Sequence, residues 1–105
     1  MPGGCWYKFM MENIKSEHAD DLFEAILSLE NLDECYRFFD DLCTIAEINA
    51  MSKRLLAAKM LRNGEVCSEV SAKTGQSTAT ISRVNKCLKY GSDGYNIVLN
   101  RTKKP

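Results

Sequence analysis

Residues 68–88 read SEVSAKTGQSTATISRVNKCL, and this stretch decides the fold of the 105-residue chain. Two helices that cross near a right angle need a small residue at the crossing and a tight turn between them. Ser71 is small enough to lie beneath the second helix, and Gly75 can adopt the positive φ of the turn. The pattern predicts a helix-turn-helix. Its inward-packing apolar residues are expected to be Val70, Ile81 and Val84.

The outward face of the second helix is unusually rich in short hydroxyl side chains. Serine and threonine are poor helix formers, so helix propensity does not explain their number. Small polar side chains and a methyl group at the start of a helix suit close approach to base edges in a DNA major groove, and flanking lysines suit phosphates. The predicted DNA-binding residues are Ser68, Lys73, Gln76, Ser77, Thr78, Ala79, Thr80, Ser82 and Lys86.

An ordinary helical hairpin with a surface rich in threonine and serine is the alternative interpretation. The charge distribution bears on this choice, because the neutral chain divides into an acidic first half and a basic second half. Residues 1–50 carry a net charge of −8, residues 51–90 carry +6, and residues 91–105 carry +2. This asymmetry suggests a polyanion partner on one face, although two solvated surfaces that attract each other would also produce it.

The rest of the chain predicts an all-α protein. Apolar residues recur at spacings of three and four, and the alternation typical of strands is absent. Residues 1–15 lack a helical period and are expected to form a flexible tail before one domain over residues 16–105. Helices are expected over about residues 16–29, 31–42, 44–63, 67–73, 77–89 and 93–101.

Sequence signals also mark the ends and faces of these helices. Thr44 and Glu47 have the spacing of a capping box, and Gly64 can end the long helix in the left-handed conformation. Asn31 or Asp33 can cap the second helix. The first, long and last helices are each expected to place apolar residues on one inward face, and these are Leu22, Ile26, Leu29, Ile48, Met51, Leu55, Ala58, Tyr95, Val98 and Leu99. Four aromatic residues are expected in the core or in a dimer interface, namely Phe23, Tyr36, Phe38 and Phe39.

Several classes of function are not expected from this composition. No nucleophile–base pair, metal-ligand cluster or glycine-rich phosphate loop is evident, so we expect neither an enzyme nor a metal or cofactor. No apolar run approaches the roughly 20 residues of a membrane span, and no signal peptide is evident. The cysteines form no C-x-x-C pair and predict free thiols in a cytoplasmic protein. They are Cys5, Cys35, Cys43, Cys67 and Cys87.

Five stretches together resemble the Trp repressor family. The most specific is ATISR at residues 79–83, and NAMSKR at residues 49–54 supports it. The upstream runs DLFEAILSL at residues 21–29 and ECYRFFDDLCT at residues 34–44 look like the YerC/YecD-like branch of that family, with LRNGE at residues 61–65 completing the pattern. The resemblance covers most of the chain.

The resemblance implies an intertwined, all-helical homodimer in which the N-terminal helices of two subunits interlock. It also implies a transcriptional regulator, expected to be a repressor, that presents one helix-turn-helix per subunit to double-stranded DNA. The residues by themselves predict only a helix-turn-helix that binds DNA. A helical protein-interaction module without DNA binding, and a repressor with an amino-acid corepressor, remain as alternatives.

The family's corepressor site is partly matched. The resemblance places Thr44, Arg54 and Arg83 at positions that hold tryptophan in the Trp repressor. Val84 stands where the family has glycine, and Cys87 stands where it has the serine that binds the amino group. A valine side chain would fill the slot, and a thiol is a poor acceptor for an ammonium group. We therefore expect a different small effector, or none, in place of tryptophan, and the residues expected to bind such an effector are Thr44, Arg54, Arg83 and Cys87.

Overall fold

The computed structural model describes residues 15–103, and these residues form helices and connecting segments with no strand among them. The all-α prediction is confirmed. Apart from Lys15, the predicted N-terminal tail lies outside the described residues. No described helix combines the length and apolar character of a membrane span. The helices are α2 (Glu17–Leu27), α3 (Leu32–Leu42), α4 (Ile45–Arg62), α5 (Cys67–Thr74), α6 (Thr78–Tyr90) and α7 (Gly94–Arg101).

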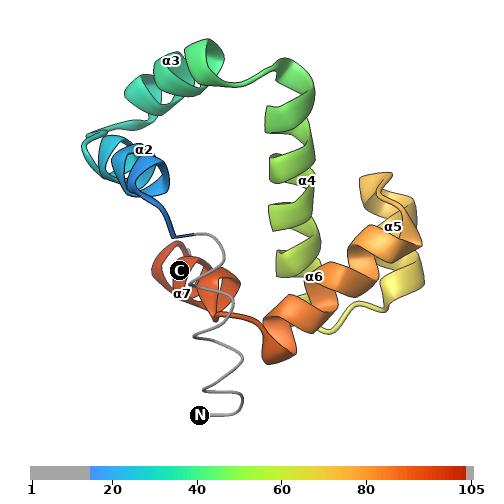
Figure 1. Cartoon of the computed structure of the whole chain (residues 1–105). Coiled ribbons are helices and arrows are strands. Elements are labelled where there is room, and N and C mark those ends of the chain that lie inside the picture. Colours follow the sequence, from blue (N-terminus) through green and yellow to red (C-terminus); the bar gives the residue numbers. More distant parts are fainter. Residues whose placement is uncertain (1–14, 104–105) are drawn as a thin grey trace.

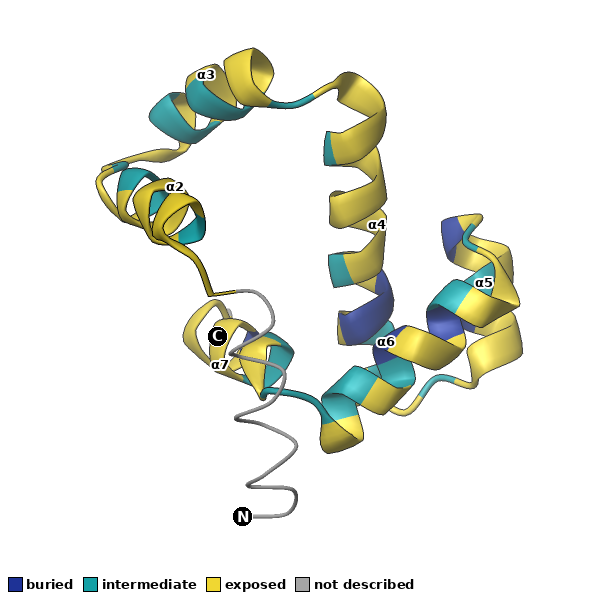
Figure 2. Ribbon diagram, in the orientation of Figure 1, coloured by how far each residue is buried: buried dark blue, intermediate teal, exposed yellow. Residues whose placement is uncertain are grey.

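The long helix α4 organises the molecule (Figure 1). The helices α5 and α6 pack against its C-terminal half, and α7 also contacts both α4 and α6. The pair α2 and α3 extends away from the other end of α4 as a separate arm (Figure 1). Figure 2 shows that the buried residues gather where α4, α5 and α6 meet, and no residue of α2 or α3 is buried. The core consists of Ala57, Ala58, Val70, Ile81, Val84 and Leu99.

Side-chain caps fix where the two helices of the arm begin. Ser16 accepts a hydrogen bond from the backbone amide of Ala19 at 3.0 Å and caps α2. Asn31, rather than Asp33, caps α3, because its side-chain oxygen accepts from the amide of Glu34 at 2.9 Å. These caps satisfy amide groups that a helix leaves unpaired at its first turn. The arm is therefore helical for local reasons, even though its apolar residues remain uncovered.

The predicted capping box at the start of α4 is present. The amide of Glu47 donates to Oγ1 of Thr44 at 3.1 Å, and the amide of Thr44 donates to Oε1 of Glu47 at 2.8 Å. Hydrogen bonding from the backbone amide of Thr44, and then from its side chain, favours the charged carboxylate and holds the pKa of Glu47 below its ordinary value. This reciprocal pair sets the point at which the arm ends and α4 begins.

At the other end of α4, Gly64 takes the left-handed conformation that the sequence predicts, with φ of +94°. Its amide donates to the carbonyl of Leu61 at 3.0 Å, and the amide of Glu65 donates to the carbonyl of Met60 at 3.1 Å. These two bonds form the Schellman arrangement that closes a helix and redirects the chain. The chain then enters α5.

Some predictions of packing are wrong for the single chain. Val98 was expected to pack inward, but it is 45% exposed, because α7 packs through Leu99 and Tyr95 instead. Met51 is likewise exposed, because α5 and α6 cover only the C-terminal half of α4. Ala57 is fully buried and was missed, because it lies beside the predicted stripe that ends at Ala58 rather than on it. It lies where α4 approaches the helix-turn-helix.

Candidate nucleic-acid interface

The turn between α5 and α6 is held by two side chains of α5. Gly75 has φ of +73°, a conformation that suits glycine. The hydroxyl of Ser71 donates to the carbonyl of Gln76 at 2.6 Å. The hydroxyl of Thr74 donates to the carbonyl of Val70 at 2.7 Å and accepts from the amide of Gln76 at 3.3 Å. Ser71 therefore contributes a hydrogen bond as well as its small size, which the sequence pattern did not reveal.

The inner side of the helix-turn-helix is tightly packed. Val70 and Ile81 are fully buried and Val84 is only 2% exposed, as the sequence predicts. Burying one such aliphatic side chain stabilises a fold by about 1.5–3 kcal/mol. These contacts hold α6 against α4 and α5, so its opposite side remains available to a partner.

Two of the predicted hydroxyl groups form the first turn of α6. The amide of Thr80 donates to Oγ of Ser77 at 3.1 Å, so Ser77 caps the helix. The hydroxyl of Ser77 donates to Oγ1 of Thr80 at 3.0 Å. Ser77 and Thr80 thus support each other, and Thr80 is only partly exposed. Substituting either residue would change the helix start as well as any contact with DNA.

Another set of predicted residues shares one outward side of α6. Thr78, Ser82 and Lys86 are exposed and follow each other at intervals of four, which places them on one face of a helix. Ala79 is exposed beside them. Within residues 15–103, the side chains of Thr78, Ser82 and Lys86 make no hydrogen bond or ion pair. We call Thr78, Ala79, Ser82 and Lys86 the reading face.

The remaining predicted residues differ in their surroundings. Ser68 is exposed on the first turn of α5, and Gln76 is half-buried in the turn. Lys73 forms an ion pair with Glu65, with Nζ and Oε1 2.8 Å apart. The hydrogen bond and charge of Glu65 raise the pKa of Lys73. Glu65 was missed, because it precedes Lys73 by eight residues and lies outside the helix, where no helical spacing links the two.

Three of the four predicted effector residues, Arg54, Arg83 and Cys87, affect the pKa of the Tyr95 side chain. Burial raises the pKa of Tyr95, the charges of Arg54 and Arg83 lower it, and Cys87 raises it further. Thr44 does not join them in a single chain, since it lies ten residues before Arg54 and α4 rises about 1.5 Å per residue. The separation along the helix is roughly 15 Å. Sequence reasoning assigned Tyr95 to packing alone.

The family model described as Trp repressor protein matches residues 17–103, which include every described helix. The chain belongs to the Trp repressor family. Members of this family are regulators that bind DNA, and α5, α6 and the turn at Gly75 lie within the matched range. The predicted family is therefore confirmed.

Individual relatives agree with this membership and with the predicted branch. This Trp repressor family member is 51% identical over 94 residues to YerC, an uncharacterized protein of Bacillus subtilis, and the match covers 90% of each chain. A proposed Trp repressor from Staphylococcus aureus has a similar solved structure, with a TM-score of 0.80, 48% identity, and coverage of 87% of this chain and 91% of that one. A TrpR-like protein from Eubacterium eligens also has a TM-score of 0.80, with 52% identity and coverage of 86% and 93%.

Proposed function

We propose that the protein is a cytoplasmic, homodimeric transcriptional repressor that binds a specific double-stranded DNA sequence. The observation that carries the proposal is the one-sided burial of α6. Ile81 and Val84 fix its inner side in the core, while the reading face is solvent-exposed and without intramolecular partners in the described part of the chain. A rigidly held helix with small polar groups near its N-terminus suits insertion into a major groove.

Local charge and backbone geometry support phosphate contacts beside the reading face. The N-terminus of α6 carries unpaired amide groups and the positive end of the helix dipole, and it has no acidic residue in its first turn. Lys86 and Lys89 are exposed further along the same helix. The helix N-terminus and these two lysines would contribute affinity that does not depend on sequence, while Thr78, Ala79 and Ser82 of the reading face would contribute specificity.

The uncovered arm supports the dimer. Amphipathic helices normally bury their apolar stripe, yet no residue of α2 or α3 is buried in the single chain. Leu27 is 82% exposed, and Leu32 and Tyr36 are each 71% exposed. A second copy of the arm offers the same apolar surface, so an isologous dimer would cover both. Such a dimer predicts a near-palindromic operator with half-sites about one helical turn apart.

Selection of bound sequences from random double-stranded DNA tests the proposal directly. An enriched, near-palindromic site is the expected result, followed by fluorescence anisotropy on that site and on unrelated DNA over a series of salt concentrations. Failure to bind any DNA at low salt, where phosphate contacts are strongest, would overturn DNA binding. Recovery of a stoichiometric protein partner in its place would favour an interaction module.

Thr78→Ala is the substitution that tests base reading, because Thr78 is exposed and its side chain has no hydrogen bond within residues 15–103. Binding to the selected site should weaken by about tenfold, near the cost of one lost base contact, while binding to unrelated DNA changes little. Thr80→Ala is less informative, since Thr80 also bonds Ser77. Equal loss on both DNAs would argue that Thr78 contacts phosphate only.

We also propose that tryptophan is not the effector of this protein. Val84 lies in the hydrophobic core and Cys87 is half-buried on the same helix, so neither provides the open slot and hydroxyl of the Trp repressor. Arg54 and Arg83 remain near Tyr95 and could receive another small molecule. Isothermal titration calorimetry with tryptophan should show no binding. A dissociation constant in the micromolar range would show that the objection from Val84 and Cys87 is wrong.

A further inference from the structure

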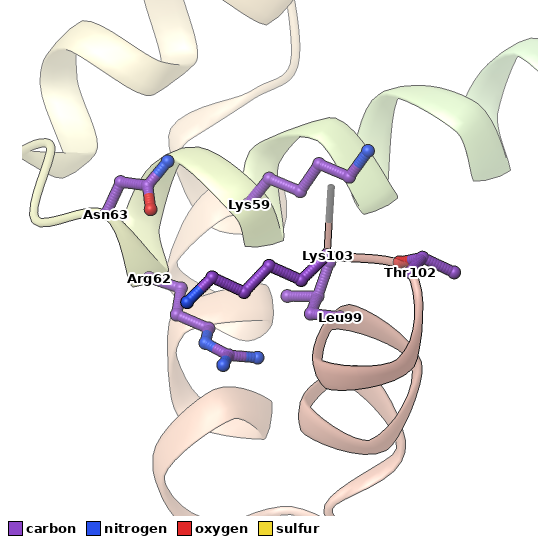
Figure 3. A pocket seen from close by; sticks show the side chains of 6 residues that line it. All are labelled: Lys59, Arg62, Asn63, Leu99, Thr102 and Lys103. Atoms are coloured by element: carbon purple, nitrogen blue, oxygen red, sulfur yellow. The ribbon is translucent and has the colours of Figure 1, made fainter. Parts of the chain in front are cut away.

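An open pocket lies between the C-terminal end of α4 and α7 (Figure 3). Its volume is about 490 Å³, which lies in the range of small-molecule sites. It shares no residue with the reading face or with the effector positions. Its lining residues are Lys59, Arg62, Asn63, Leu99, Thr102 and Lys103.

The pocket gathers positive charge and no carboxylate. Lys59, Arg62 and Lys103 line it, and Figure 3 shows the side chain of Lys103 extending towards that of Arg62. Arg62 donates to two neutral acceptors on α7, the carbonyl of Asn96 and the side-chain oxygen of Asn100. These bonds position the guanidinium but leave its charge uncompensated. Glu65 follows nearby in the sequence, but it is paired with Lys73.

The helix dipoles offset only part of this positive charge. Lys59 and Arg62 lie in the last turn of α4, and Lys103 follows the end of α7, so each is near a helix C-terminus. A helix C-terminus carries about half a negative charge. Two such ends offset about one of the three positive charges, and an excess of about two remains. A dianion would neutralise that excess.

We propose that this pocket binds a small organic phosphate through a phosphomonoester group. The phosphate group carries a charge of about −1.5 to −2 at neutral pH, which matches the excess positive charge. Lys59, Arg62 and Lys103 hold its oxygens. The partly exposed surface beside Leu99 receives the carbon part of the ligand, since the pocket is larger than a phosphate ion requires.

Nuclear magnetic resonance titration of the full-length, DNA-free protein tests the proposal, with inorganic phosphate and phenyl phosphate as probes at constant ionic strength. Saturable shifts are expected at the amides of residues 59–63 and 99–103, and phenyl phosphate should bind more tightly than inorganic phosphate. Binding should weaken between pH 7.5 and 5.5, because the phosphate loses its second charge near pH 6. No saturable shift at these amides would overturn the proposal.

Matched lysine variants separate the pocket from general surface charge. Lys59→Gln and Lys103→Gln should each weaken phenyl phosphate binding by about fivefold, as expected for one lost ion contact. Lys53→Gln, on an exposed part of α4 outside the pocket, should leave it unchanged. Equal weakening by all three variants would mean that the anion binds diffusely and would overturn the site.

The source of the phosphate is distinguished by a separate measurement on DNA. If the pocket takes a free small molecule, Lys59→Gln leaves the salt dependence of DNA binding unchanged. The expected effect of Lys86→Gln is a slope of log affinity against log salt concentration that is smaller by about one unit. The same reduction in Lys59→Gln would mean that the pocket contacts the DNA backbone and would overturn the proposal. Because the anion titration contains no DNA, its result does not depend on whether the reading face binds DNA.

Discussion

At the scale of single residues, Gly75 carries the conformational requirement of the helix-turn-helix. Its φ of +73° is costly for other residues, yet a Cβ added there would meet nothing within 4 Å. Gly75→Ala should therefore destabilise the protein by about 1–2 kcal/mol through backbone strain alone. Gly75→Asn should cost less, because asparagine tolerates the left-handed region. Urea unfolding of both variants measures which one is less stable. Equal destabilisation by alanine and asparagine would mean that the cause is steric and not backbone strain.

Gly91 is required for a different reason, which is space. Its φ is negative, but a Cβ there would lie 2.6 Å from the carbonyl oxygen of Cys87. That oxygen is backbone at the last turn of α6, so it cannot move without disturbing the helix end. Gly91→Ala should lower the free energy of unfolding by about 1–3 kcal/mol, the usual cost of an overpacked site. Gly94→Ala is the matched control, since its Cβ would meet open space.

The pairing of Lys73 with Glu65 makes a prediction for DNA binding. Glu65 neutralises a lysine that was expected to contact phosphate, and its own charge would repel DNA. Glu65→Gln should strengthen binding to unrelated DNA at low salt and steepen the salt dependence by up to about one unit. Anisotropy over a salt series measures both. A variant whose slope matches the wild type would show that Lys73 does not reach the backbone.

At the scale of elements, the start of α4 should respond to acid. The capping box lowers the pKa of Glu47 in the folded protein below its ordinary value of 4.5. A carboxyl group whose pKa is lowered by folding stabilises the fold above its unfolded pKa, and this contribution disappears as the pH falls through the folded pKa. The stability difference between wild type and Glu47→Gln should therefore be full at neutral pH and should shrink below about pH 4.5.

Urea midpoints measured for both proteins at neutral pH and at several acidic pH values check this prediction. Glu69→Gln is a suitable control, because Glu69 is exposed on α5 and takes no part in a capping box. A Glu47→Gln difference that stays constant down to acidic pH would mean that the carboxylate charge does not contribute. The ion pair in the arm, between Asp33 and Arg37, has both side chains exposed and should contribute little.

At the scale of the whole molecule, the proposed dimer predicts that a charged side chain introduced on the apolar surface of the arm destabilises the dimer. Leu32→Glu introduces a carboxylate on a surface that is exposed in one chain and covered in the proposed dimer. It should shift the protein towards monomer or unfold it, as seen by sedimentation and circular dichroism. Val66→Glu is the control, because Val66 is exposed at the start of α5, outside the arm. A Leu32→Glu protein that keeps the wild-type mass and stability would contradict the dimer.

Local signals in the sequence determined the helices and the helix-turn-helix. The capping box at Thr44, the left-handed glycines at 64 and 75, and the cap at Ser77 all act within a few residues, so they can be recognised without tertiary contacts. The buried side of α6 also followed from helical periodicity. The resemblance also identified the family and its branch, which the comparison with known proteins confirms.

Only the tertiary structure decided the relations between distant residues. It paired Glu65 with Lys73, brought Arg54 and Arg83 near Tyr95, and formed a basic pocket between α4 and α7. It also showed that Ser77 and Thr80 bond each other, which leaves the reading face as the freer set. These contacts depend on how the helices pack and on the path of the loops that connect them, so the spacing of residues within one helix does not predict them. The stretch at residues 68–88 therefore specified the reading helix, whereas packing specified which of its side chains remain available to DNA.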